Sequence, residues 1–363
     1  MSELSELIVR EIKSTGPITF ERFMEQALYH PRCGYYMTAG EKIGSRGDFY
    51  TAPAVNTLFG AMLARQLYQM WLAEGSPKQW TIVECGPGTG HLARDIMSAL
   101  HKEQPDLYAA LDYCLIEVSA YLIEVQRQTI EAGIAENSKY RWLSSFSEIS
   151  DLKGCILANE LVDALPVHLV EQTAQGLQEL YVAVQENGDL ILKLGPLSTP
   201  GLAECFELQN CCLAEGQRAE VNLRARQWLI EAVNSLQKGH LIIIDYGAET
   251  EELYACQRMD GTLRCFYKHQ LIENPFLNIG QQDITAHVNF SLLSLWGKQL
   301  GLTVKKVISQ PEFLLQMGLF DLLRSQTDYL KGPETAEVVS AIKKLVLPGG
   351  MGSIFKVSIM DKL

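Results

Sequence analysis

The chain has 363 residues, of which 47% are hydrophobic and 20% charged, and its formal net charge is −12. This composition is typical of a folded globular protein, and no apolar run approaches the roughly 18 residues of a membrane span. The negative charge and the absence of a basic tract argue against nucleic acid as a partner, and they are compatible with a basic protein or peptide.

Cysteine spacing and the N-terminal residues exclude further classes. The nine cysteines are scattered without a C-x-x-C pair, so we expect no metal site. Residues 1–6 are acidic and lack the basic region of a secretory signal or the arginines of a transit peptide. We therefore expect a cytoplasmic protein with reduced cysteines and no membrane insertion.

The first part of the chain is predicted to be mainly helical. Helices are expected at residues 3–14, 19–28 and 56–74, with Thr19 as the N-cap of the second. A loop at residues 44–53 separates the last two. In this loop Asp48 precedes Phe49, which is typical of an Asx turn with one buried aromatic side chain.

The most informative segment is residues 81–91, T-I-V-E-C-G-P-G-T-G-H. A short apolar strand ends in Glu84, and Gly86, Gly88 and Gly90 follow before an amphipathic helix. Glycines permit positive φ and let a ligand approach the backbone. Open α/β sheets bind their ligands outside the carboxyl ends of the strands, which is where this turn is expected.

The glycine spacing distinguishes between cofactor classes. A dinucleotide fingerprint needs its third glycine where His91 stands, and a phosphate loop needs a lysine that is absent. The pattern E-x-G-x-G-x-G instead resembles the first motif of class I S-adenosylmethionine (SAM) methyltransferases. A plain strand-to-helix turn is the alternative interpretation.

A second apolar strand, residues 111–119, carries Glu117 near its end. A carboxylate at this point can accept hydrogen bonds from both hydroxyls of a cofactor ribose. Alone, Glu117 would be interpreted as a solvated carboxylate. With the glycine turn one strand earlier, ribose binding is favoured.

The remaining pattern alternates strands and helices. Further strands are predicted at residues 140–145, 154–159, 241–247, 304–308 and 355–359. Residues 168–194 alternate apolar and polar residues and turn at Asn187-Gly188, which predicts a hairpin. We expect an N-terminal segment (residues 1–75), a core (76–165 and 236–363) and an insertion (166–235).

Several segments along the chain carry a family resemblance. They are residues 16–20 (GPITF), 29–31 (YHP), 34–36 (GYY), 47–53 (GDFYTAP), 84–90 (ECGPGTG), 158–166 (ANELVDALP), 244–247 (IDYG) and 283–288 (DITAHV). Over nearly its whole length the chain resembles the MidA-type SAM-dependent methyltransferases, whose mitochondrial members assemble respiratory complex I. The resemblance implies an α/β class I (Rossmann-like) sheet with an N-terminal helical lid and a β-rich insertion after the fourth strand. It also implies SAM as cofactor and arginine methylation of a protein.

The candidate acceptor residues follow the fourth strand. A guanidinium is oriented by planar pairing with carboxylates, and Glu160 and Asp163 are placed to provide them. Asn159 is expected at the cofactor, with an amide-type acceptor as the alternative for its side chain. A simple turn would also explain this cluster. His287 is a candidate catalytic histidine, with a structural role as the alternative.

The expected cofactor site combines the residues above. Its members are Asp48, Glu84, Gly86, Gly88, Gly90, Glu117, Phe146 and Asn159. Asp48 is included because the resemblance places it in the lid, and Phe146 because adenine usually lies after the third strand of this fold. A core position is the default interpretation for a phenylalanine such as Phe146.

Three functions compete at this stage. The first is SAM-dependent arginine methylation of a protein, such as a respiratory-complex subunit. The second is a nicotinamide-dependent oxidoreductase, which His91 disfavours. The third is an assembly chaperone that retains a SAM-binding fold. A homodimer is compatible with each of these functions.

Overall fold

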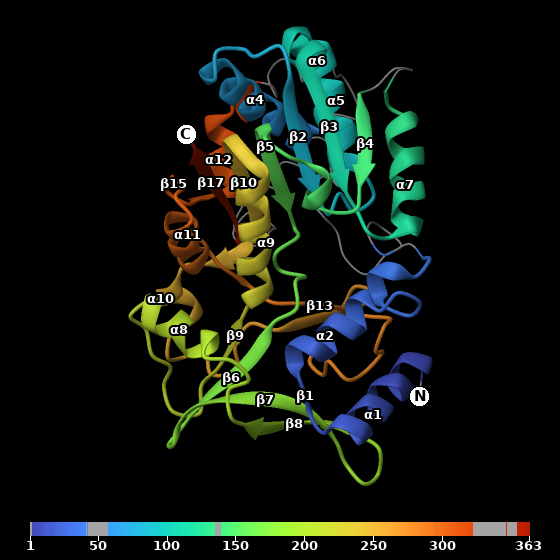
Figure 1. Cartoon of the computed structure of the whole chain (residues 1–363), viewed down its shortest axis with the longest axis vertical. Coiled ribbons are helices and arrows are strands. Elements are labelled where there is room, and N and C mark those ends of the chain that lie inside the picture. Colours follow the sequence, from blue (N-terminus) through green and yellow to red (C-terminus); the bar gives the residue numbers. More distant parts are fainter. Residues whose placement is uncertain (1, 41, 43–56, 135–138, 322–345, 347–353) are drawn as a thin grey trace.

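The central feature of the protein is a sheet of seven main strands with one antiparallel edge (Figure 1). The computed structural model describes residues 2–40, 42, 57–134, 139–321, 346 and 354–363. The strands are β2 (Trp80–Cys85), β3 (Leu111–Ile116), β4 (Tyr140–Leu143), β5 (Leu152–Asn159), β10 (Leu236–Ala248), β15 (Thr303–Val304) and β17 (Phe355–Lys362). Their order is β15-β17-β10-β5-β2-β3-β4, and only β15 and β17 run antiparallel to their neighbours. The sequence therefore predicted the parallel strands and their order along the chain correctly.

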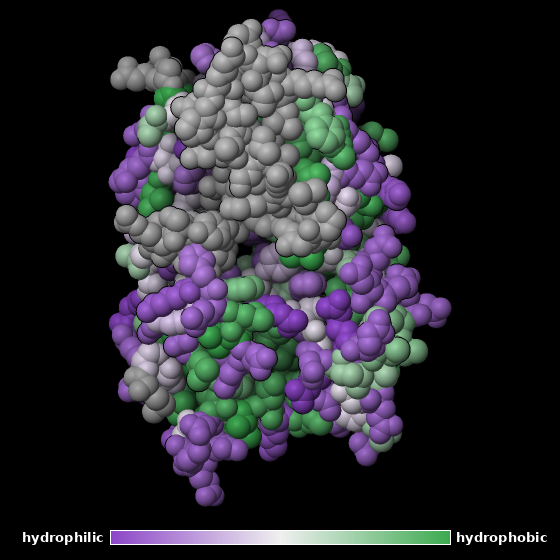
Figure 2. Space-filling model, turned by 180° about the vertical axis from the view of Figure 1, so that it is seen from behind, coloured by the Kyte–Doolittle hydropathy of each residue, from purple (hydrophilic) through white to green (hydrophobic). Residues whose placement is uncertain are grey.

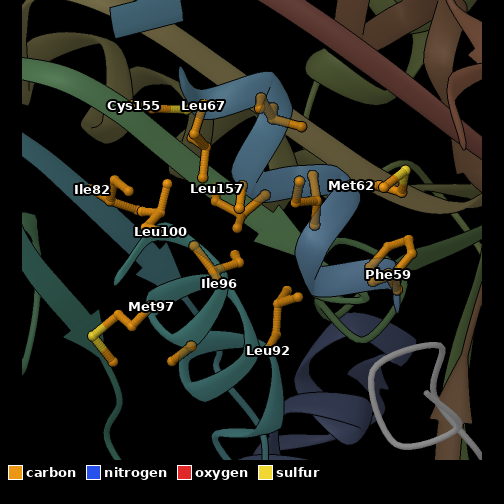
Figure 3. Packing of buried hydrophobic residues seen from close by; sticks show 14 of the residues in the cluster. Phe59, Met62, Leu67, Ile82, Leu92, Ile96, Met97, Leu100, Cys155 and Leu157 are labelled. Carbon is orange, nitrogen blue, oxygen red and sulfur yellow. The ribbon is translucent and has the colours of Figure 1, made fainter. Parts of the chain in front are cut away.

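Each face of this sheet is covered by helices, because successive residues of a strand point to opposite faces. On β2, Ile82 packs into one core and Val83 into the other. Helices α4 (Leu58–Ala73) and α5 (His91–Glu103) cover the first face, where their apolar side chains meet those of β2 and β5 (Figure 3). Helices α9 (Leu223–Ser235) and α11 (Phe290–Gln299) cover the second face.

A smaller antiparallel sheet lies beside the main one. It contains β1 (Ile18–Thr19), β6 (His168–Thr173), β7 (Gly176–Val184), β8 (Leu190–Gly195) and β9 (Arg218–Val221). The predicted hairpin is confirmed: β7 pairs with β8, and Gly188 at the turn has a φ of 91°. Strand β1 pairs with β7, so the N-terminal segment joins this sheet.

The N-terminal helices pack on the smaller sheet and form a third core. Helices α1 (Glu3–Thr15) and α2 (Phe20–Tyr29) precede the 3-10 helix η1 (Tyr35–Met37). Thr19 caps α2 as predicted, because its hydroxyl accepts a hydrogen bond from the amide of Arg22 at 3.1 Å. These elements occupy the lower half of Figure 1, and in Figure 2 an apolar area on the back of this half is bordered by polar residues.

The remaining elements connect these layers. They are α6 (Pro105–Ala110), α7 (Ala120–Glu131), η2 (Phe146–Glu148), α8 (Gly201–Leu208), α10 (Thr250–Leu253), β11 (Arg264–Tyr267), β12 (Gln270–Ile272), β13 (Asp283–Thr285), β14 (Val288–Asn289), β16 (Ile308–Ser309) and α12 (Gln310–Gln316). Among the described residues, no helix has both the length and the apolar character needed to cross a bilayer.

One predicted strand was wrong, and one predicted loop is not described. Residues 304–308 are not a continuous strand: β15 and β16 each pair briefly with β17, at Thr303–Val304 and Ile308–Ser309. Two lysines interrupt the apolar pattern there, and Lys305 forms an ion pair with Asp361. Asp48 and the segment 47–53 lie outside the described residues.

Candidate active site

The carboxyl ends of the parallel strands meet at a cavity of about 1440 Å³. In Figure 1 the strands β2, β3 and β5 point toward the half that contains the N-terminal helices, and the cavity lies at these ends. Its lining includes nine of the residues selected from the sequence: Glu84, Gly86, Gly88, Glu117, Phe146, Asn159, Glu160, Asp163 and His287. Gly90 is not part of the lining. These nine residues lie at or just beyond the ends of five strands, β2, β3, β4, β5 and β13, and they surround one space.

The glycine turn between β2 and α5 has the expected left-handed backbone. The φ angles are 65° at Gly86, 54° at Gly88 and 82° at Gly90. A Cβ at Gly86 would lie 2.8 Å from a methyl carbon of Leu161, and one at Gly90 would lie 3.0 Å from the Cα of Gln126. The role of Gly90 is thus to begin α5 closely packed against α7, while Gly86 and Gly88 face the cavity.

Glu117 is held in place by three hydrogen bonds. Its Oε1 accepts from the amides of Val118 and Ser119 at 2.9 and 2.8 Å, and its Oε2 accepts from Nε2 of Gln126 at 2.9 Å. A carboxylate has about four acceptor positions, so one position on Oε2 is left for a ligand hydroxyl. Burial raises the pKa of Glu117, and these hydrogen bonds oppose that shift.

Gln126 is a site residue that the sequence analysis missed. It is fully buried on α7, and the same Nε2 donates to the carbonyl of Gly88 at 2.9 Å. Its Oε1 accepts from the indole of Trp142 at 2.8 Å. One side chain therefore links the glycine turn to Glu117. No sequence pattern marks this glutamine, because a polar residue on a helix is usually exposed.

Glu84 occupies the end of β2 and is only 2% exposed. The phenol of Tyr113 on β3 donates to its Oε2 at 2.6 Å. Burial raises the pKa of Glu84 to about 7, and the hydrogen bond from Tyr113 opposes this shift only in part. A cation in the cavity would favour the ionised carboxylate.

An apolar wall follows β3 and β4. Phe146 begins η2 and is 7% exposed, and its ring centre lies 6.5 Å from that of Trp228 on α9. Val118, Tyr121 and Leu122 line the cavity near Glu117. A flat heteroaromatic group beside the ribose would be covered by these side chains.

The loop after β5 brings amide and carboxylate groups to the cavity. Asn159 ends the strand, and its Oδ1 has no hydrogen-bond partner among the described residues. Glu160 has a left-handed φ of 52°, and its amide donates to the carbonyl of Ile244 at 2.9 Å. Asp163 is 5% exposed, and burial raises its pKa to about 6.

Asp245 on β10 shapes this loop from within. It is fully buried, and its Oδ2 accepts from the amides of Val162 and Asp163 at 2.9 and 3.2 Å. Its Oδ1 accepts from the amide of Tyr246 at 2.9 Å. Burial and the charge of Asp163 raise the pKa of Asp245 well above its ordinary value. Asp245 therefore fixes the backbone that carries Asp163.

His287 lines the same cavity beyond β13. Its amide donates to the hydroxyl of Thr262 at 3.0 Å, and its ring lies edge-on to Tyr246 with ring centres 5.5 Å apart. Burial, together with Arg258 and Arg264, lowers the pKa of His287 to about 4. The imidazole is therefore neutral near pH 7. In the described part of the chain, no cluster of side chains is suited to a metal ion.

Comparisons with known proteins agree with this geometry. Residues 62–308 match a family model described as "Putative S-adenosyl-L-methionine-dependent methyltransferase". The chain is 30% identical to "Protein arginine methyltransferase NDUFAF7, mitochondrial" of Mus musculus, over 96% of this chain and 82% of that protein. Its Drosophila melanogaster homologue is 28% identical, over 97% and 83%.

Solved structures agree as well. A Burkholderia thailandensis protein crystallised with S-adenosyl-homocysteine is 33% identical, and the match covers 99% of this chain and 92% of that one with a TM-score of 0.89. A native structure from the same organism has a TM-score of 0.86 and 32% identity. The nicotinamide alternative is therefore set aside, and the chain belongs to this family of SAM-dependent class I methyltransferases.

Proposed function

We propose that this enzyme transfers the methyl group of SAM to arginine side chains of a protein substrate. The observation that carries the proposal is the shared cavity. It has the glycine turn and Glu117 on one side and the carboxylates of Glu160 and Asp163 on the other. The names of the relatives, protein arginine methyltransferases, support the same acceptor.

The cofactor half fits SAM in three respects. The free acceptor position on Glu117 suits a ribose hydroxyl, and the wall around Phe146 suits adenine. The carboxylate of Glu84 and the unpartnered Oδ1 of Asn159 suit the ammonium of the methionine part. When bound, SAM supplies an electrophilic methyl group on its sulfonium. The chain's own residues position it and exclude water.

The acceptor half supplies negative charge. We propose that Glu160 pairs with the guanidinium and orients the reacting nitrogen. Methylation of that nitrogen releases one proton, and Asp163 is placed to accept it because its pKa of about 6 suits a base near neutral pH. His287 is neutral and less basic, so we propose that it orients the phenol of Tyr246 and that Asp163 takes the proton.

The test is methyl transfer from radiolabelled SAM into proteins of a bacterial lysate, followed by acid hydrolysis and separation of the amino acids. We expect the label in methylated arginine. Glu160→Gln should keep SAM affinity and lower transfer by about 10²-fold, a loss of about 3 kcal/mol in transition-state stabilisation. Glu186→Gln, a change of an exposed turn residue, is the matched control and should keep full transfer.

Other outcomes would point elsewhere. Label in glutamine, together with loss of transfer in Asn159→Ala but not in Glu160→Gln, would favour a neutral amide acceptor. SAM binding without any transfer would favour an assembly chaperone that retains the fold. A role in assembling a respiratory complex is part of our proposal, because the family resemblance implies it. Identification of the labelled protein tests that part directly.

A further inference from the structure

The N-terminal segment reaches the acceptor side of the cavity. Tyr29, at the end of α2, donates its hydroxyl to the carbonyl of Ala164 at 3.0 Å. Tyr36, in η1, donates its hydroxyl to Oδ1 of Asp283 at 2.7 Å. The two phenol rings stack with centres 5.5 Å apart and planes inclined by 28°. Both tyrosines line the cavity, so they form one of its walls.

Asp163 lines the same cavity, and backbone hydrogen bonds join its loop to the neighbouring segments. The amide of Ala286, just beyond β13, donates to the carbonyl of Asp163 at 3.0 Å. Asp283 begins β13 and is 2% exposed, while Asp163 is 5% exposed. Figure 1 shows α2 beside β13. Three segments that are distant in the sequence therefore bring two buried carboxylates to the same place.

Tyr246 completes the group from β10. The carboxylates of Asp163 and Asp283 both raise the pKa of Tyr29, Tyr36 and Tyr246, although burial is the larger cause in each case. Each of the two carboxylates is therefore close enough to each of the three phenols to influence its ionisation. The phenol of Tyr246 and the backbone near Ala164 hydrogen-bond to the carboxyl of Asp163, but among the described residues its Oδ1 has no hydrogen-bond partner. A buried carboxylate oxygen of this kind is costly unless a cation or a further donor reaches it.

We propose that Asp163 and Asp283, together with Tyr29, Tyr36 and Tyr246, complete the subsite in which Glu160 pairs with the guanidinium of the methyl acceptor. The subsite rests on the proposed function and adds that the N-terminal segment helps to select the acceptor. Two carboxylates from separate segments match the N–H edges of a planar cation. The phenol rings provide faces for its delocalised charge. A compact ammonium lacks both the planar edges and the delocalised charge.

The test uses the full chain saturated with S-adenosyl-homocysteine. Three probes are titrated by calorimetry: N-acetyl-arginine methylamide, the lysine analogue and the neutral citrulline analogue. We expect the arginine probe to bind at least tenfold more tightly than the other two. Asp283→Asn and Tyr36→Phe should each weaken it about tenfold and leave the S-adenosyl-homocysteine affinity unchanged. Tyr181→Phe is the control, since it removes a phenol that donates to the carbonyl of Pro196 outside the cavity.

Each other outcome overturns the subsite. If the citrulline probe binds as tightly as the arginine probe, the site does not recognise the positive charge. If the lysine probe binds as tightly as the arginine probe, the site does not recognise the planar shape of the guanidinium. If folded Tyr36→Phe binds the arginine probe with unchanged affinity, the N-terminal segment does not take part in selecting the acceptor. This conclusion would hold even if Asp283→Asn failed to fold. The proposed function is tested separately: methylarginine formation with an unchanged acceptor KM in Asp283→Asn would leave that function standing and refute the subsite.

Discussion

Replacement of Glu84 by glutamine should change how stability depends on pH. Burial raises the pKa of Glu84 from 4.5 to about 7 in the folded protein. The folded state therefore retains a proton that the unfolded chain releases, and stability falls as pH rises from 4.5 to 7. Above pH 7 the loss of stability amounts to about 3 kcal/mol, because each unit of pKa shift corresponds to about 1.36 kcal/mol. Glutamine keeps the shape of the side chain and cannot ionise.

Urea denaturation without SAM measures this effect. The free energy of unfolding of Glu84→Gln minus that of the wild type should increase by up to about 3 kcal/mol between pH 4.5 and pH 8. The difference cancels the titration of groups common to both proteins. The exposed-residue variant Glu186→Gln should show no such increase. If the free energy of unfolding of Glu84→Gln minus that of the wild type stays constant over this pH range, the assignment of the raised pKa to Glu84 is refuted.

The remaining predictions concern the cavity and the N-terminal segment. Gly88→Val should abolish SAM binding while the circular dichroism spectrum stays native, because its φ of 54° disfavours a branched residue. Glu117→Ala should weaken SAM binding by about 1–3 kcal/mol in calorimetry, and equal affinity would contradict ribose contact. Methyl transfer should fall as pH drops below about 6, where Asp163 gains its proton, and Asp163→Asn should lower transfer and flatten this profile. Deletion of residues 2–40 should yield insoluble protein, because Phe20 and Phe23 are fully buried, and a soluble product that binds SAM would contradict this.

The features predicted well from the sequence are local ones. The glycine turn follows from residue spacing within one strand-turn-helix unit. The hairpin at Asn187-Gly188 likewise depends on neighbouring residues only. The position of Glu117 at the cavity follows from the rule that parallel strands end at the same edge. For this reason the sequence could predict that the glycine turn and Glu117 lie at one cavity.

The features missed from the sequence depend on distant contacts. Tyr36 and Asp283 meet through a hydrogen bond although 247 positions separate them. The residues around Tyr36 do not indicate that Asp283 is its partner, and those around Asp283 do not indicate Tyr36. Gln126 was missed because its burial depends on how α7 packs against the glycine turn. The sequence pattern also predicted one strand where β15 and β16 are separate, because the break between them depends on how each pairs with β17.

The pairing of β1 with β7 has a consequence for synthesis on the ribosome. Ile18 pairs with Val182 and Thr19 with Tyr181, so the first two helices have no sheet to pack on until that part of the chain has emerged. Helices α1 and α2 are synthesised before β7, so their apolar faces are exposed to water until β7 has emerged. Nascent chains that stall before β7 should therefore be the species that chaperones bind and proteases cleave.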